Sequence, residues 1–126
     1  MKSIAQSLGH ALSGLVEAVK TERNIKLFLC GYCVVLALSF YCKLTANEWL
    51  WIIVAGGMFL SIELLNTALE HLADILDESK ESPKDPAYHS AMKAAKDIAS
   101  SASLVSLIAS GTIIVIIFAP HFFRFV

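Results

Sequence analysis

The chain has 126 residues, of which 56% are hydrophobic and 17% are charged, and its formal net charge is −1. This length predicts a single domain, 1–126, and the composition is too apolar for an ordinary soluble protein of that size. The balanced charge predicts no nucleic-acid partner. The three cysteines, Cys30, Cys33 and Cys42, lie in one apolar segment without a second ligand pair. We therefore expect packing residues there, not a metal or redox site.

The first predicted element, residues 1–24, is an amphipathic helix. Apolar residues recur at helical spacing between Ile4 and Val19, and polar residues stand between them. A helix of this kind lies on a membrane surface. The segment lacks the continuous apolar block of a signal peptide, so we do not expect it to be cleaved.

Three apolar segments follow, and they predict transmembrane helices over residues 27–42, 49–69 and 97–119. The first two are short for a span, but lysines and aromatic residues at their ends extend their reach. Pro120 is expected to close the third. The expected fold is therefore all-α and integral to a membrane, with one surface helix and three spans.

The connection over residues 75–95 is charged and contains Pro83 and Pro86, which predicts a cytoplasmic loop. An excess of basic residues in short segments marks the cytoplasmic side of a membrane protein. Eight such residues lie before the first predicted span or between the second and third, and two lie on the opposite side, so the N-terminus is also predicted to be cytoplasmic. The eight are Lys2, Lys20, Arg23, Lys26, Lys80, Lys84, Lys93 and Lys96, and the two are Lys43 and Arg124.

The second predicted span continues into "IELLNTALEHLAD", which carries Glu63, Asn66, Glu70 and Asp74. Their spacings of 3, 4 and 4 residues place the four side chains on one helix face, within roughly 80° of arc. Ionisable groups near membrane depth cost free energy, and like charges on one face repel one another, so a compensating cation is expected. The polar residues expected at the same level are Lys96 with Asp97 and Glu22 with Arg23.

Carboxylates, an amide and a lysine at a lipid–water boundary suit magnesium-dependent phosphoryl transfer. Glu63, the deepest acid, is best placed to take a proton from a lipid hydroxyl. Neither GxxxxGK[ST] nor GxGxxG occurs in the chain, which excludes the soluble kinase folds. The residues alone leave two alternatives open: polar contacts between the helices of a non-catalytic scaffold, and a proton-relay or transport site.

The motif "ELLNTALEHLAD", followed by "AKDIASSA" at the third span, resembles a family signature. That signature is E-x-x-N-[ST]-A-[IL]-E-x-x-x-D with a later A-K-D, and it belongs to the prokaryotic diacylglycerol kinases. The N-terminal "LGHALSGLVEAVKTERN" resembles the family's surface helix, and the likeness covers residues 3–118. The resemblance implies a homotrimer of the bacterial cytoplasmic (inner) membrane with shared active sites. It also implies that ATP, with Mg²⁺ as cofactor, phosphorylates a lipid hydroxyl.

The resemblance further implies roles for particular residues. Glu63 matches the catalytic base, and Glu22 and Glu70 match metal-binding acids beside the nucleotide. Asn66 and Asp74 belong to the active-site face. Nucleotide contacts are implied at His10, Ala87, Tyr88, His89, Lys96 and Asp97, and lipid access is implied at Ser7, Leu8, Gly9, Ala11, Leu12 and Ser100.

The lipid is expected to be diacylglycerol, with phosphatidic acid as the product. Undecaprenol, giving undecaprenyl phosphate, is the alternative, because "TERNIKL" around Glu22 is similar to family members that phosphorylate it. His71 points about 100° away from the stripe and is expected at a helix interface. The serines of the third span are expected to act as small residues that let helices pack closely.

Overall fold

The computed structural model describes residues 3–78 and 85–123. In these residues the chain forms four helices: α1 (Ile4–Thr21), α2 (Arg23–Tyr41), α3 (Ala46–Glu78) and α4 (Pro86–Phe123). The helices α2, α3 and α4 are long and apolar enough to cross a membrane. The predicted all-α fold, with an N-terminal helix ahead of three apolar helices, is confirmed.

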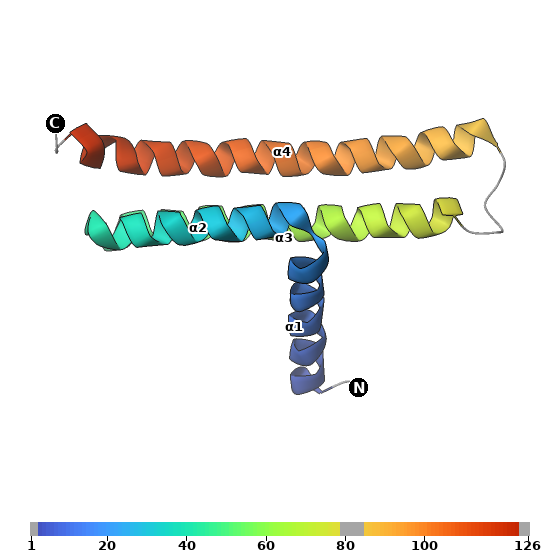
Figure 1. The fold of residues 1–126 in the computed structure, drawn as a ribbon, viewed down its shortest axis with the longest axis horizontal. Helices are drawn as coiled ribbons and strands as arrows, with labels where there is room; N and C mark the ends of the chain where they lie inside the picture. Colours follow the sequence, from blue (N-terminus) through green and yellow to red (C-terminus); the bar gives the residue numbers. More distant parts are fainter. Residues whose placement is uncertain (1–2, 79–84, 124–126) are drawn as a thin grey trace.

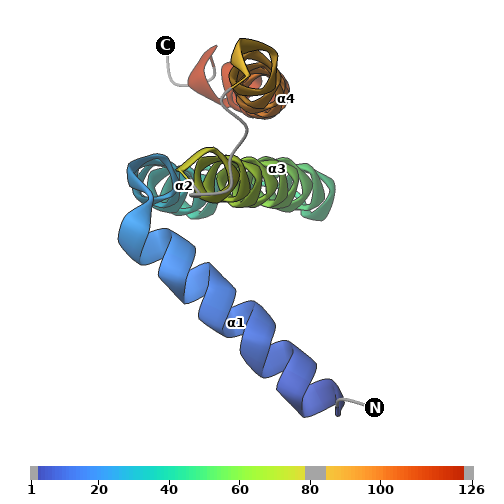
Figure 2. The same cartoon turned by 90° about the vertical axis from the view of Figure 1, so that its right-hand side faces the viewer.

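The three long helices run antiparallel to their neighbours in the chain (Figure 1). Viewed from the end, α2 and α3 lie side by side and α4 lies over them, while α1 leaves the bundle sideways (Figure 2). Because α2 is much shorter than α3, it accompanies only the first part of α3. The second part of α3 extends past the α1–α2 junction with α4 beside it.

An apolar core joins the long helices at the end where α2 passes into α3. Its buried members are Leu44, Ile52 and Ile117. Nearer the middle, Phe28 of α2 packs on Phe59 of α3 with ring centroids 4.4 Å apart. Many other large apolar side chains of these helices stay exposed, as expected of helices that face lipid.

The surface helix α1 begins with a capping box. The Ser3 hydroxyl accepts the Gln6 N–H, and the Gln6 side chain accepts the Ser3 N–H. Glu22, in an extended conformation, then separates α1 from α2. The apolar face of α1 is exposed and suits a membrane surface, and it is formed by Ile4, Leu8, Leu12 and Val16.

The structure corrects the predicted loop over residues 75–95, because α3 continues to Glu78 and α4 already begins at Pro86. Proline fits the first turn of a helix, where its missing N–H would have had no partner within the helix. The Asp85 carboxylate caps the same turn by accepting the Ala87 N–H at 2.9 Å.

The predicted end of the third span at Pro120 also differs from the structure, since α4 passes through this residue to Phe123. A proline so close to a helix end removes few of the hydrogen bonds that hold the helix. Several residues used in the sequence argument lie outside the described part of the chain, namely Lys2, Lys80, Pro83, Lys84 and Arg124.

Candidate active site

The four side chains predicted to share a face lie along the second part of α3. Their exposure rises towards the end of the helix: Glu63 is 4% exposed, Asn66 is 7% exposed, Glu70 is half-buried and Asp74 is exposed. A carboxylate as buried as Glu63 needs a hydrogen-bond donor, because burial removes its contacts with water.

Two serines of α4 supply such donors. The Ser103 hydroxyl donates to Glu63 Oε2. One turn earlier, the Ser100 hydroxyl donates to Glu70 Oε1 at 3.0 Å, and Asn66 Nδ2 donates to the same oxygen at 3.0 Å. Helix α4 therefore holds both carboxylates in place from the opposite side of the α3–α4 interface.

A cavity of about 510 Å³ opens beside these residues. Its polar walls come from α3, α4 and the first turn of α2, and the remaining walls are aliphatic or aromatic. An elongated apolar molecule with one polar end fits this distribution of groups. The lining residues are Asn24, Leu27, Phe28, Phe59, Glu63, Asn66, Glu70, Ser100, Ser103, Leu104 and Leu107.

One buried atom of a cavity-lining residue lacks a partner within the described part of the chain. No described donor reaches the Asn66 side-chain oxygen, Oδ1, although the amide nitrogen of the same side chain is bound to Glu70. A buried acceptor without a donor is uncommon in folded proteins and points to a ligand or ion. Amide and carboxylate oxygens are also the ligands that Mg²⁺ prefers, usually one or two of them together with phosphate oxygens and water.

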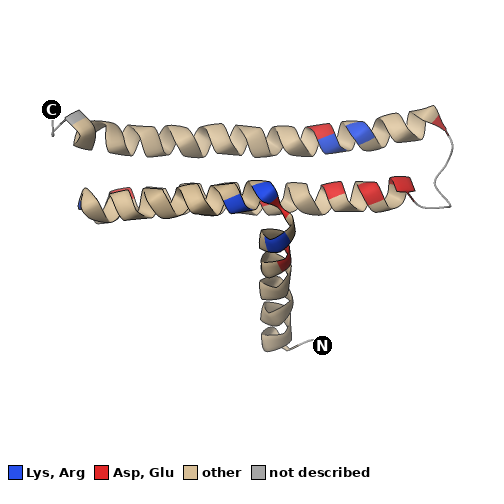
Figure 3. Cartoon of the chain, viewed as in Figure 1, with Lys and Arg blue, Asp and Glu red and all other residues tan. Residues whose placement is uncertain are grey.

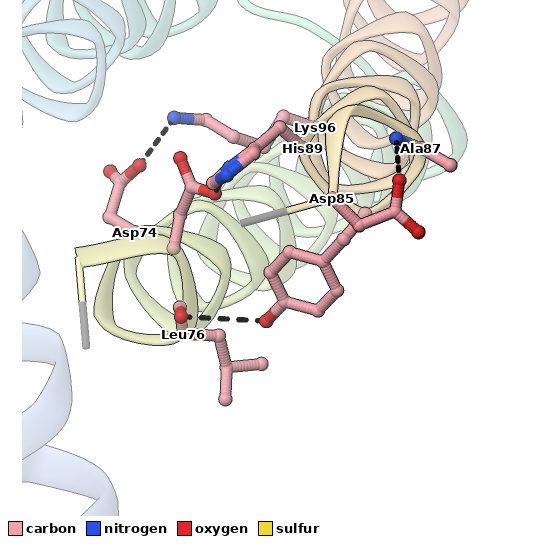
Figure 4. Close-up of polar contacts among 8 residues, drawn as sticks. Asp74, Leu76, Asp85, Ala87, His89 and Lys96 are labelled. Atoms are coloured by element: carbon pink, nitrogen blue, oxygen red, sulfur yellow. Dashed lines mark hydrogen bonds and ion pairs between the residues drawn. The ribbon is translucent and has the colours of Figure 1, made fainter. Parts of the chain in front are cut away.

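A second polar group lies further along α3, where acidic and basic residues of α3 and α4 face each other (Figure 3). Lys96 Nζ lies 2.6 Å from Asp74 Oδ1 (Figure 4). This hydrogen bond to the Asp74 carboxylate raises the pKa of Lys96, which precedes the apolar stretch of α4 and so lies outside the predicted span. Lys96 therefore carries its charge throughout the neutral pH range. A small cavity of about 180 Å³ here is lined by Ala73, Asp74, Asp77, His89, Met92, Lys93, Lys96 and Asp97.

Three predicted nucleotide contacts begin α4 in this region. His89 Nδ1 is bound to Asp77, and the Tyr88 hydroxyl donates to the Leu76 carbonyl at 3.4 Å (Figure 4). Both side chains tie the start of α4 to the end of α3. Ala87 is exposed in the first turn.

Glu22 lies at the junction between α1 and α2. Its Oε1 is 3.2 Å from Nε2 of His71 on α3. The predicted interface histidine therefore joins the α1–α2 junction to α3. In the described part of the chain, no group of three His, Cys, Asp or Glu side chains is arranged to hold a metal ion. In the described residues the two predicted metal-binding acids also have separate partners, since Glu22 contacts His71 and Glu70 contacts Asn66 and Ser100.

The predicted contacts on α1 stay apart from the Glu63 cavity in the single chain, whose walls include none of residues 7–12. Only Ala11 of this set lines a groove against α3, about 380 Å³ in volume, that also includes His71. The remaining members are exposed along α1, and they are Ser7, Leu8, Gly9, His10 and Leu12.

Sequence reasoning missed two polar partners. Ser103 was assigned to packing alone, although it binds Glu63, and no partner was proposed for His71, which binds Glu22. The sequence does contain a signal for Ser103. A buried acid requires a hydrogen-bond donor, and serines recur at helical spacing along one face of the third predicted span. The contact between His71 and Glu22 joins residues 49 positions apart and left no local signal.

These features define a class: a multi-pass membrane protein with buried, hydrogen-bonded carboxylates at one end of its spans. The profile of the family described as "Prokaryotic diacylglycerol kinase" matches residues 9–118. An undecaprenol kinase of Bacillus subtilis (strain 168) is 39% identical over 116 residues, which cover 91% of this chain and 87% of that protein. The chain belongs to the prokaryotic diacylglycerol kinase family, as its motifs predicted. It is therefore a lipid kinase that uses ATP, and not the scaffold or transporter that the residues alone left open.

Proposed function

We propose that the protein transfers the γ-phosphoryl group of ATP to the terminal hydroxyl of undecaprenol, giving undecaprenyl phosphate. The observation that carries this proposal is the position of Glu63, a carboxylate only 4% exposed on the wall of a largely apolar cavity. A hydroxyl on a hydrocarbon chain reaches such a carboxylate from the lipid phase, whereas a water-soluble acceptor would lose its hydration there.

One observation favours undecaprenol as the lipid: the relative that is 39% identical over nearly the whole chain is an undecaprenol kinase. The apolar walls of the cavity suit the hydrocarbon chain of either lipid, and they are Leu27, Phe28, Phe59, Leu104 and Leu107. Diacylglycerol, the lipid expected from the sequence, is the second candidate and is supported by the family description. It carries two ester groups near its hydroxyl, which require polar surroundings or water.

Glu63 is the proposed catalytic base. As the lipid hydroxyl oxygen attacks the γ-phosphorus, the bond from that phosphorus to the bridging oxygen breaks and ADP leaves. The hydroxyl proton passes to the Glu63 carboxylate. Its position on the wall of the cavity lets it take the proton directly from a hydroxyl bound there.

Glu70 and Glu22 are the proposed magnesium-binding acids, and the unpaired Asn66 oxygen is a further ligand of the preferred kind. Magnesium bound with ATP supplies positive charge to the phosphate oxygens. Lys96 is proposed to stabilise charge on the transferred phosphoryl group. To do so it exchanges its ion pair with Asp74 for one with the nucleotide.

The remaining nucleotide contacts are proposed at His10, Ala87, Tyr88, His89 and Asp97. His10 lies on α1 together with the lipid-access residues Ser7, Leu8, Gly9, Ala11 and Leu12. This helix contributes no wall to the Glu63 cavity of its own chain. A homotrimer, in which a neighbouring protomer completes the site, would provide what the single chain lacks. We place the protein in the bacterial cytoplasmic membrane with its N-terminus and active site on the cytoplasmic side.

The proposal is tested by transfer of labelled γ-phosphate from MgATP to undecaprenol and, in parallel, to diacylglycerol. Purified protein in mixed micelles is compared with its Glu63→Gln variant. We expect label in undecaprenol, and a loss of at least about 100-fold in the variant, with ATP affinity nearly intact, because the amide cannot accept the proton.

Faster labelling of diacylglycerol would transfer the assignment to the second lipid. If Glu63→Gln lost ATP binding instead of turnover, Glu63 would belong to the nucleotide or metal site and not to proton transfer.

A further inference from the structure

A serine on α4 supports the carboxylate on which the proposed chemistry depends. The Ser103 hydroxyl donates to Glu63 Oε2 across the α3–α4 interface. Ser103 is 8% exposed and Glu63 is 4% exposed, so water does not compete for this contact. We propose that Ser103 is a positioning residue that orients Glu63 for proton abstraction, an inference that rests on the proposed function.

The direction of the Ser103 hydroxyl separates it from an ordinary packing serine. Hydroxyl groups in helices commonly donate to a carbonyl of the preceding turn. Ser39 donates in this way to Val35, and Ser101 to Asp97. Ser103 instead donates to a side chain of another helix, 40 residues away in sequence.

Neighbouring serines on the same face provide an internal comparison. Ser106 is as buried as Ser103, but its hydroxyl has no partner among the residues that the structure describes. Ser110 donates to the Ala55 carbonyl at 2.9 Å, which joins the helices without touching an acid. Burial on this face of α4 therefore does not by itself lead to a contact with Glu63.

The hydrogen bond has one consequence for a general base. It holds one carboxylate oxygen, Oε2, and so restricts the rotation of the Glu63 side chain. In the proposed role, the other oxygen, Oε1, receives the lipid proton. The lipid hydroxyl and ATP make no required contact with Ser103 in this scheme, so its loss acts on turnover through Glu63.

The test measures kcat and KM for MgATP and for the lipid in Ser103→Ala. Loss of a hydrogen bond to a charged group should lower kcat by roughly 10- to 150-fold. Both KM values should stay within about twofold of wild type. Ser103→Thr, which keeps the hydroxyl, should recover most of kcat, and Ser106→Ala should match wild type.

A second variant guards against a cavity effect. Ser103→Cys leaves no cavity, because sulfur is larger than the hydroxyl oxygen, but it offers only a weak donor, so it should lose kcat as Ser103→Ala does. A readout independent of activity is the infrared carboxylate band of Glu63, identified by its absence in Glu63→Gln. The band should shift in Ser103→Ala and stay in place in Ser106→Ala.

Several results would overturn the role of Ser103. These are a wild-type kcat in Ser103→Ala, an equal loss in Ser106→Ala, an unshifted Glu63 band, or a loss that Ser103→Thr does not recover. If the wild-type protein labels no lipid, the proposed function fails; if it labels lipid and Ser103→Ala does so equally well, only the positioning role fails.

Discussion

Glu70 makes both of its described hydrogen bonds through one oxygen. Asn66 and Ser100 donate to Oε1, each at 3.0 Å, while the Asn66 carbonyl oxygen beside them has no donor. In the described residues no hydrogen bond reaches Glu70 Oε2 or the Asn66 oxygen. Because carboxylate and amide oxygens are the ligands that Mg²⁺ prefers, we propose that these two atoms contribute to the magnesium site.

Glu70→Gln tests this interpretation. Glutamine keeps the shape of the side chain and one carbonyl oxygen but removes the charge, so it should weaken magnesium binding. We expect the magnesium concentration for half-maximal phosphoryl transfer to rise at least about 10-fold, with a fall in turnover at saturating ATP. Titration of activity with MgCl₂ measures the effect.

The control for Glu70→Gln is Glu17→Gln, which removes an exposed acid from α1 and should leave the titration unchanged. An unchanged magnesium requirement in Glu70→Gln would remove Glu70 from the metal site.

Helices α2 and α3 approach closely at one glycine. A methyl group built on Gly56 would lie 2.4 Å from the ring of Tyr32, far inside van der Waals contact. The Tyr32 hydroxyl donates to the Ile52 carbonyl at 3.0 Å and fixes the ring over the glycine. This contact holds α2 against the part of α3 that precedes Glu63, so it supports the cavity from the apolar side.

The paired substitutions Gly56→Ala and Gly57→Ala test this contact. The two glycines are adjacent in one helix, but a methyl group on Gly57 would meet nothing within 4 Å. Gly56→Ala should lower the free energy of unfolding by about 1–3 kcal/mol through overpacking. Gly57→Ala should raise it by roughly 0.5–1 kcal/mol through reduced backbone entropy.

Thermal unfolding in detergent compares these two variants with wild type. Equal stability of the two variants would show that Tyr32 moves aside without cost.

The elements that could be predicted from the sequence are those set by local periodicity. The spacing of Glu63, Asn66, Glu70 and Asp74 places them on one helix face whatever helix lies opposite. The face could therefore be predicted, although the residues that contact it could not. The end of α3 at Glu78 and the start of α4 at Pro86 were missed, because proline ends some helices and begins others. The capping contact between Asp85 and Ala87 decides between these cases.

The partners across helices could not be predicted for a different reason. Which face of α4 meets α3 depends on the packing of two helices that are each apolar on most sides, so periodicity leaves the choice open. The same holds for α1, whose residues 7–12 were expected at the site but line none of the Glu63 cavity in one chain.

At the scale of the whole molecule, polar contacts between α3 and α4 occur at both ends of the bundle. His121 Nε2 lies 2.9 Å from Glu48 Oε1 where α3 begins, and Lys96 pairs with Asp74 where α3 nears its end. Between these ends the outer surfaces of the helices are largely apolar, whereas the α3–α4 interface holds the buried Glu63 with Ser103 and the hydrogen bond from Ser110 to the Ala55 carbonyl. In the described residues, the candidate site therefore extends from the middle of α3 towards the Lys96–Asp74 end and does not reach the His121–Glu48 end.

The basic residues predict which end faces the cytoplasm, and labelling of single cysteines can test it. After replacement of Cys30, Cys33 and Cys42, which form no disulfide in the structure, a cysteine is introduced as Asn47→Cys or as Ser90→Cys. Both positions are exposed, at the start of α3 and the start of α4 respectively. In right-side-out vesicles an impermeant maleimide should label the first at once and the second only after permeabilisation. The reason is that eight of ten basic residues lie before the first predicted span or between the second and third. The reverse pattern would place the site outside the cell, where ATP is scarce, and would contradict a cytoplasmic kinase site.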